Sequence, residues 1–444
     1  MLVEVSIGDL LDRLSILDIK KSKILNVEQL AAIDREIEAL SSARKYSNDF
    51  PACFLYNLLV HVNTQIWNFS DEVKTFEHTA DPVRYASLAN KIFDYNDRRY
   101  RIKNRFNKLH DSSLQEQKGY AKLSLAIQVN SLDLFYSKLS VINEYSIKYD
   151  SIVFISEYVK EIGCIYPMYS VVKDAPANAR VALLDELTHD GESEVYEFTP
   201  ISYVSHGKMG DFIHSLSVIA EHFWNTGRKG VLYIWDQAEK FSYSLEKAYE
   251  DTKEIVSMQP YIKSYDIFIG QPININLGSW RNGPYVYRET WNKIYQTEYG
   301  VNWGSRKWLF IPEDDRFKNK ILIHTSQRRP NTRFNMNEFK DTYPNEDIVF
   351  VSEFQFEYDD FVKRHSCTSI PFMKVNSIMD FYKAIASCKY FVGNLSMPIC
   401  VADAMFKNRL ALLSNRIEDN LVMSEDNHVM NMSHLWPMCT LFSA

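Results

Sequence analysis

The sequence predicts an α/β protein in which two Rossmann-like domains follow an all-helical N-terminal domain. Residues 1–120 carry apolar residues at helical spacing with few glycines, which is typical of a helical bundle. From residue 196 onward, short apolar runs alternate with helical patterns, as in the βαβ units of a parallel sheet. The alternation restarts near residue 318, which predicts a second α/β domain. We therefore divide the chain into residues 1–120, 121–195, 196–316 and 317–444.

Composition narrows the class of protein. The chain has 444 residues with 46% hydrophobic residues, which is ordinary for a soluble globular protein of two or three domains. Its formal charge of −7 argues against a dedicated nucleic-acid binder. Six cysteines without a C-x-x-C pair indicate reduced thiols and no zinc site. With no signal peptide and no spanning apolar run, we expect a cytoplasmic protein whose membrane contact, if any, is peripheral at the inner membrane.

The N-terminal domain reads as four helices. Ser6 begins the first, Pro51 opens the third, and Asp81-Pro82 opens the fourth, which runs to about Leu109. A basic cluster lies on the fourth helix: Arg98, Arg99, Arg101, Lys103, Arg105 and Lys108. Two interpretations stay open. The cluster meets anionic lipid or a phosphorylated acceptor, or it is a solvated face paired with acids such as Asp94 and Asp97.

The same segment resembles a known family. VSIGDLLDRLSILDIKKSKI, YNDRRYRIKNRFNKL and EQKGY resemble a small all-helical bacterial domain family of unknown function, over nearly all of residues 1–120. The resemblance implies no chemistry. The domain could dimerise the protein, hold an acceptor or touch the membrane. Residues 121–195 read as a small α/β insert, or as strands added to the next sheet, and then as a linker over residues 174–193.

The first Rossmann-like domain opens with a strand, a turn and a helix over residues 201–219. Gly207 and Gly210 permit the tight turn, and Asp211 falls in the first turn of the helix. Open α/β sheets bind ligands at this carboxyl end of their strands. The alternative is that Asp211 only caps the helix. In the long loop after residue 270, Trp280 and Arg281 could stack on or grip a sugar, or anchor the loop.

The second Rossmann-like domain has two strand ends suited to phosphate. Hydroxyl and guanidinium groups follow the strand at residues 320–324, and guanidinium groups give forked hydrogen bonds to pyrophosphate. A glycine turn and a hydroxyl follow the strand at residues 390–393, just before a helix whose N-terminus favours anions. The alternatives are a basic surface turn and an ordinary strand-to-helix turn.

These segments together resemble one enzyme family. HGKMGDFIHSL, ILIHTSQRRPNTRF and SIMDFYKAIASCKYFVGNLSMPICVADAMFKNRLALL are similar to the heptosyltransferase-type glycosyltransferases, which act on ADP-heptose and lipopolysaccharide. They occur in the family's order and cover residues 200–440, about half the chain. The resemblance implies the two-domain GT-B fold, with residues 196–316 on the acceptor side and residues 317–444 on the donor side.

The resemblance also implies a mechanism. A metal-independent, inverting transfer would move a sugar from a nucleotide sugar to a surface glycan or lipopolysaccharide-type acceptor, without a cofactor. Asp211 would be the catalytic base. Lys208, His214, Trp280 and Arg281 would bind acceptor, although a histidine beside apolar neighbours can equally be structural. The donor-binding residues would be Thr325, Ser326, Arg328, Arg329, Arg333, Glu353, Gly393, Asn394 and Ser396.

The chain departs from the family pattern in the second turn. Leu395, Met397 and Cys400 stand where the family has an acid, a glycine and a histidine, and Thr332 or Arg333 stands at its phosphate-loop lysine. The nucleotide need not be ADP. Two alternatives therefore remain: a catalytically inactive sugar-nucleotide-binding or scaffold protein, and a nucleotide-sugar epimerase. The sequence has no D-x-D motif at a predicted strand end, so it gives no indication of a metal site. A homo-oligomer through the helical domain is a further expectation.

Overall fold

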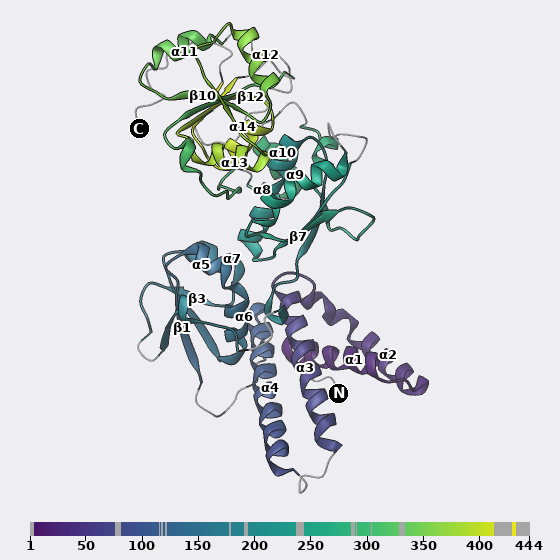
Figure 1. Ribbon diagram of the computed structural model, residues 1–444. Helices are drawn as coiled ribbons and strands as arrows, with labels where there is room; N and C mark the ends of the chain where they lie inside the picture. Colours follow the sequence, from purple (N-terminus) through teal and green to yellow (C-terminus); the bar gives the residue numbers. More distant parts are fainter. Residues whose placement is uncertain are drawn as a thin grey trace. The chain divides into compact units, whose positions relative to one another are not determined.

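The computed structural model is described for most of the chain (Figure 1). The described residues are 4–75, 81–114, 116, 119, 122–176, 179–190, 194–236, 244–285, 289, 291–302, 304–327, 334–412 and 429–431. They form two compact units: Met1–Thr199 with Trp224–Arg228, and Pro200–Phe223 with Lys229–Ala444. We call these unit 1 and unit 2. In this part of the chain, no helix is long and apolar enough to cross a membrane.

Unit 1 begins with the predicted helical bundle. Its helices are α1 (Ile7–Lys23), α2 (Val27–Leu40), α3 (Ala52–Lys74) and α4 (Pro82–Leu109), with the 3-10 helix η1 (Ser41–Ser47) after α2. The Ser6 hydroxyl accepts a hydrogen bond from Asp9 N at 3.1 Å, and the Asp81 carboxylate caps α4 in the same way. Leu14, Leu59 and Phe106 are fully buried where α1, α3 and α4 pack together. The prediction of a helical N-terminal region is confirmed.

Unit 1 also contains its own parallel sheet. The strands β1 (Ser124–Gln128), β2 (Ser151–Ile155), β3 (Ser170–Val172) and β4 (Arg180–Leu183) pair in the order β3-β2-β1-β4. The helices α5 (Leu132–Ser137), α6 (Leu139–Lys148) and α7 (Val159–Ile165) connect them, with η2 (Leu184–Glu186) and η3 (Glu194–Tyr196) following. The strands therefore form a separate sheet and do not extend the next one. The predicted linker was wrong at residues 180–183, which form a short, largely exposed edge strand.

The last turn of α8 and the residues after it belong to unit 1. Tyr136 donates its hydroxyl proton to Trp224 O at 3.1 Å, and Arg228 Nε donates to Thr199 O at 2.7 Å. Gly227 has φ +69°, and a Cβ there would lie 2.7 Å from Phe198 Cε2. The chain thus enters unit 2 at Pro200, returns to unit 1 at Trp224, and leaves again at Lys229.

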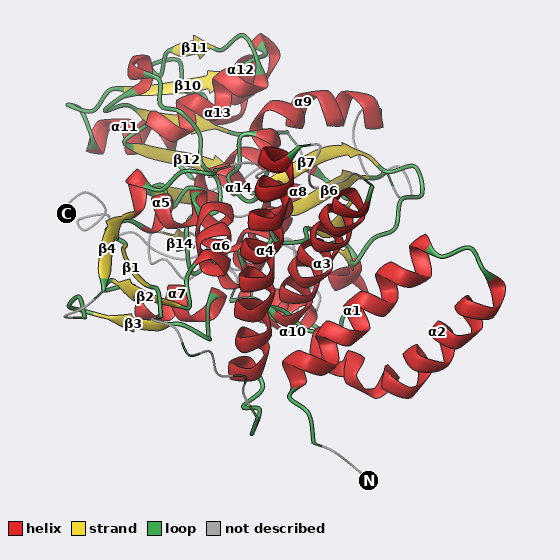
Figure 2. Cartoon of the chain, turned by 90° about the horizontal axis from the view of Figure 1, so that it is seen from below, coloured by secondary structure: helices red, strands yellow, loops and turns green. Residues whose placement is uncertain are grey.

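Unit 2 contains two more parallel sheets. The first has the order β7-β6-β5-β8 and comprises β5 (Ile201–Ser205), β6 (Gly230–Ile234), β7 (Ile262–Ile267) and β8 (Ile275–Asn276). Its helices are α8 (Met209–Thr226), α9 (Leu245–Ser257), α10 (Trp291–Tyr299) and the 3-10 helix η4 (Ser279–Asn282). Figure 2 shows α9 and the paired strands β6 and β7 from a second direction. The alternating pattern predicted from residue 196 is confirmed as a parallel α/β arrangement.

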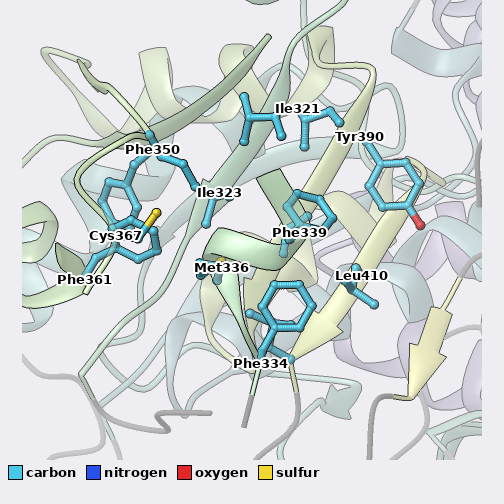
Figure 3. Packing of buried hydrophobic residues seen from close by; sticks show 14 residues of the cluster. Ile321, Ile323, Phe334, Met336, Phe339, Phe350, Phe361, Cys367, Tyr390 and Leu410 are labelled. Carbon is cyan, nitrogen blue, oxygen red and sulfur yellow. The ribbon is translucent and has the colours of Figure 1, made fainter. Parts of the chain in front are cut away.

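The second sheet of unit 2 has six strands in the order β11-β10-β9-β12-β13-β14. The strands are β9 (Ile321–His324), β10 (Ile348–Ser352), β11 (Phe372–Lys374), β12 (Tyr390–Asn394), β13 (Arg409–Leu412) and β14 (Val429–Asn431). The helices are η5 (Asp315–Phe317), α11 (Met336–Thr342), α12 (Gln355–His365), α13 (Ile378–Ser387) and α14 (Met397–Ala404). Renumbered from one, this is the 3-2-1-4-5-6 order of a Rossmann sheet. Ile323, Phe350 and Phe361 are fully buried in its core (Figure 3).

Both sheets of unit 2 share one topological feature. In each, the first strand lies between the second and the fourth, so the chain reverses its direction of travel beside that strand. These switch points are β5/β8 and β9/β12. Loops leaving the carboxyl ends of the two strands diverge there, and ligands of open α/β sheets bind at such positions.

Candidate functional site

The β5/β8 switch point is closed by an ion pair. Asp211, the third residue of α8, accepts a hydrogen bond from Arg281 Nη2 at 2.6 Å. Arg281 lies in η4, immediately after β8. The side chains are 34% exposed for Asp211 and 22% exposed for Arg281, so both remain accessible to a ligand. Among the described residues, Asp211 Oδ1 accepts no hydrogen bond, which leaves it available to a substrate hydroxyl.

Gly207 makes this ion pair possible. Its φ of +114° is a conformation that side chains disfavour, and a Cβ there would lie 2.2 Å from Arg281 Nη2. The glycine therefore lets the guanidinium group pass over the turn between β5 and α8. Lys208, the next residue, is exposed at the same turn.

His206 is a part of this site that the sequence analysis missed. Its imidazole is buried against Gly278, where a Cβ would lie 1.8 Å from His206 Nε2. Trp235, the residue after β6, meets the imidazole edge-on with ring centroids 6.2 Å apart. The only signal in the sequence was its place between a buried strand and Gly207. His206 thus packs the β5 strand end onto the loop after β8.

Trp280 is packed into the protein interior. Its indole is 3% exposed and meets Trp291 edge-on with ring centroids 4.8 Å apart. The Arg281 guanidinium lies over its ring at 4.4 Å. This packing favours the alternative that Trp280 anchors the loop and holds Arg281 in place.

His214 is buried between two helices of unit 2. It lies on α8, is 2% exposed, and places Nε2 3.5 Å from Asp403 Oδ2 on α14. Asp403 also accepts a hydrogen bond from Arg409, and both side chains are fully buried. Burial lowers the pKa of His214, but Cys400 and Asp403 more than offset it and raise the pKa to about 10. The position favours the structural alternative for His214.

The β9/β12 switch point is closed by a neutral amide. Asn394, at the end of β12, is 1% exposed and accepts a hydrogen bond from Ser326 N at 3.0 Å. Its Nδ2 donates to Ser326 O at 2.8 Å. The amide thereby pairs with the backbone of the loop after β9 in both directions. Ser396 donates its hydroxyl proton to Asn394 O at 3.2 Å and is the N-cap residue of α14.

The other predicted donor residues lie around this amide or outside the described residues. Thr325 is buried, and its Oγ1 has no hydrogen-bond partner in the described part of unit 2. A Cβ on Gly393 would lie 3.0 Å from His324 O, which explains the glycine beside β9. Glu353 follows β10 and is half-buried, and burial raises its carboxyl pKa. Three predicted residues lie outside the described residues: Arg328, Arg329 and Arg333.

The two switch points lie against each other through their helices. A Cβ on Gly210 would lie 3.1 Å from Cys400 Sγ and 3.9 Å from Met397 Cα. Gly210 is the second residue of α8 and Met397 is the first of α14, so the two helix N-termini are in contact. The sequence predicted both turns, and the structure brings Asp211 beside the turn that carries Ser396.

Potential metal ligands were considered in the same way. Within the described ranges, no three His, Cys, Asp or Glu side chains gather closely enough to hold a metal ion.

Comparison with known proteins supports parts of the sequence-based resemblances. Residues 1–138 match the model of a family of unknown function (DUF6165), which confirms the resemblance noted for the N-terminal domain. No curated protein matches the chain. The similar solved structures include glycosyltransferases.

Three of these structures illustrate the level of similarity. The dodecameric iron-containing heptosyltransferase TibC of enterotoxigenic E. coli, in complex with ADP-D-beta-D-heptose, is 9% identical, with a TM-score of 0.37 over 55% of this chain and 67% of its own. The E. coli heptosyltransferase WaaC with ADP is 9% identical, with a TM-score of 0.30 over 48% and 86%. A family 9 glycosyl transferase from Veillonella parvula is 12% identical, with a TM-score of 0.27 over 71% and 88%. Because these TM-scores are low, the proposal below depends on the chain's own residues.

Proposed function

We propose that the protein is a metal-independent, inverting glycosyltransferase with a GT-B layout and no cofactor. Residues 196–316 would bind the acceptor, and residues 317–444 would bind the nucleotide-sugar donor. The observation that carries the proposal is the contact between the N-termini of α8 and α14 at Gly210 and Met397. It supports a carboxylate on one side of a transferred sugar and an anion-binding helix N-terminus on the other.

Asp211 would act as the general base. Its carboxylate takes the proton of the acceptor hydroxyl while that oxygen attacks the anomeric carbon of the donor. The bond from that carbon to the diphosphate oxygen breaks, and the configuration inverts. The hydrogen bond from Arg281 holds Oδ2, so that Oδ1 would be the atom that faces the acceptor. Lys208 would contact the acceptor from the same turn.

The donor side would stabilise the leaving diphosphate. The Asn394 amide holds the loops after β9 and β12 together. The amides of α14 near Ser396 would then face the phosphates. The Thr325 hydroxyl, which has no hydrogen-bond partner among the described residues, would be a further donor to them. Charge would come from Arg328, Arg329 and Arg333. Glu353 would contact the ribose or the base.

The biological setting is proposed from the sequence resemblance. The acceptor would be a surface glycan or a lipopolysaccharide-type molecule. The enzyme would act in the cytoplasm, peripherally at the inner membrane. The helical domain would provide a homo-oligomer contact.

A nucleotide-sugar screen on three proteins tests the proposal. Donors are ranked by thermal shift, since a bound donor raises the melting temperature by mass action, and then assayed for nucleotide release with acceptor. We expect Asp211→Asn to bind the donor like the wild type and to lose roughly 10²- to 10⁴-fold in turnover. Asp341→Asn makes the same substitution at an exposed aspartate on α11 and serves as the control, so it should behave as the wild type.

The same screen discriminates the alternatives. An inactive sugar-nucleotide-binding protein is favoured by the occupied Asp211 Oδ2 and by Leu395, Met397 and Cys400 in the donor turn. It predicts equal donor binding by wild type and Asp211→Asn, with no transfer by either. Interconversion of free nucleotide sugars without acceptor would instead identify an epimerase. If no nucleotide diphosphate or nucleotide sugar stabilises the protein, the donor site is refuted.

A further inference from the structure

Most of the basic cluster on α4 is neutralised by acids of unit 1. Four of its six cations form ion pairs: Arg98 with Asp94 at 2.8 Å, Arg99 with Asp12 at 2.5 Å, Arg101 with Asp150 at 3.1 Å, and Lys103 with Asp9 at 2.7 Å and Glu116 at 2.8 Å. These cations hold unit 1 together. The cluster is therefore not a continuous basic face, and Arg105 and Lys108 remain to be explained.

Arg105 is a buried guanidinium group with only neutral partners. It is 2% exposed, and it donates from Nε to Tyr169 Oη at 2.7 Å and from Nη2 to Tyr149 O at 2.7 Å. Its Nη1 donates to Arg101 O at 2.8 Å. A guanidinium group has five N–H donors, so two remain beyond these bonds. No carboxylate in the described part of unit 1 pairs with it, and a buried charge without a counterion is costly.

Two lysines line the same cavity as Arg105. The cavity has a volume of about 140 Å³, and its wall includes Lys108 and Lys122. Asp150 and Glu116 also line it, but each already accepts from a cation, Arg101 or Lys103. Burial lowers the pKa of the Lys108 ammonium group, and the charges of Arg105 and Lys122 lower it further. Three positive charges therefore converge on one recess.

We propose that this cavity binds a phosphate group, either inorganic phosphate or a phosphate monoester. A phosphate carries about two negative charges near neutral pH and offers several acceptor oxygens. The two remaining Arg105 N–H groups supply directed bonds, the lysines supply point charges, and the Ser151 hydroxyl lies on the wall. The site lies in unit 1, so it does not depend on the transferase proposal.

Calorimetric titration of the full chain tests the site. Inorganic phosphate and pyrophosphate are titrated into the wild type, Lys108→Ala, Lys122→Ala and Lys91→Ala. Lys91 is the matched control, because it is an exposed lysine on α4, 17 residues and about 25 Å from Lys108. We expect each cavity variant to weaken binding about tenfold and Lys91→Ala to leave it unchanged. Added salt should weaken binding by the wild type.

A vesicle arm identifies the source of the phosphate. Phosphatidylcholine vesicles with and without phosphatidic acid are sedimented with the same proteins. If the wild type binds free phosphate and the cavity variants do not, the result supports a soluble ligand. Binding only to phosphatidic-acid vesicles, lost in the same variants, supports a lipid headgroup. The proposed site is overturned if the wild type binds neither free phosphate nor phosphatidic-acid vesicles. It is also overturned if the Lys108→Ala and Lys122→Ala variants both bind phosphate as strongly as Lys91→Ala does. Arg105→Lys, which keeps the buried charge, should weaken binding without unfolding the protein.

Discussion

The two switch points of unit 2 share a topology but are closed by opposite chemistry. At β5/β8 a charged pair, Asp211 and Arg281, joins the strand-end loops and stays partly exposed. At β9/β12 a neutral amide, Asn394, joins the loops and is almost fully buried. Exposed ion pairs contribute little to stability, whereas a buried group that loses its partner is costly. We call these two contacts the joints. We infer that the first joint, at β5/β8, is available for chemistry and that the second joint, at β9/β12, mainly fixes structure.

The largest expected effect lies where the helices behind the two joints meet, at His214. Its folded pKa of about 10 exceeds the ordinary 6.5. A raised pKa stabilises the fold fully below pH 6.5, and this contribution is lost as pH rises through about 10. The free energy of unfolding of the wild type should therefore fall between pH 7 and 10, by up to about 4 kcal/mol.

Denaturant unfolding across that pH range measures this contribution. His214→Gln should remove most of the slope, while His222→Gln on the same helix should retain it. A wild-type stability that stays constant from pH 7 to 10 would show that His214 is neutral in the folded protein. The two joints would then be coupled by packing alone.

Asn394→Ala should have the next largest effect and sharpens the contrast between the joints. It removes the partners of Ser326 N and Ser326 O, at a cost of about 2 kcal/mol in the free energy of unfolding. Urea denaturation measures this cost. Asn345→Ala, in an exposed turn, is the matched control and should change stability by less than about 0.5 kcal/mol. Equal stability of the two variants would mean that the amide does not hold the loops.

Arg281→Ala should have the smallest effect on stability. The pair with Asp211 is partly exposed, so its loss should cost less than about 1 kcal/mol. Transfer should nevertheless fall roughly 10²-fold, because the carboxylate loses its fixed orientation. Arg316→Ala, which breaks an exposed pair with Asp314, provides the control for both readouts. A large loss of stability in Arg281→Ala with unchanged turnover would reverse the inferred roles of the joints.

The sequence was informative wherever a pattern is local. Apolar periodicity predicted the α/β alternation of unit 2, and the strand predicted at residues 320–324 is found at residues 321–324. The turn containing Asp211 was predicted because the glycines, the strand and the helix are contiguous. The pairing of Asp211 with Arg281 could not be predicted, because these residues are 70 positions apart and meet only where β8 lies beside β5. Among the acids that neutralise α4, Asp94 was predicted because it lies one turn before Arg98. Asp12 and Asp150 were missed for the same reason as the Asp211 pair, since they come from other elements.

The return of the chain to unit 1 at Trp224–Arg228 has a consequence for how the protein can be divided. A gene fragment ending at Thr199 would encode all of the sheet and helices of unit 1, yet it would lack the Trp224 carbonyl that accepts from Tyr136. It would also lack Gly227, which packs on Phe198 and Leu139. Unit 1 is therefore not a contiguous cassette. A recombination event or a truncation that separates the two units must also supply a substitute for these five residues.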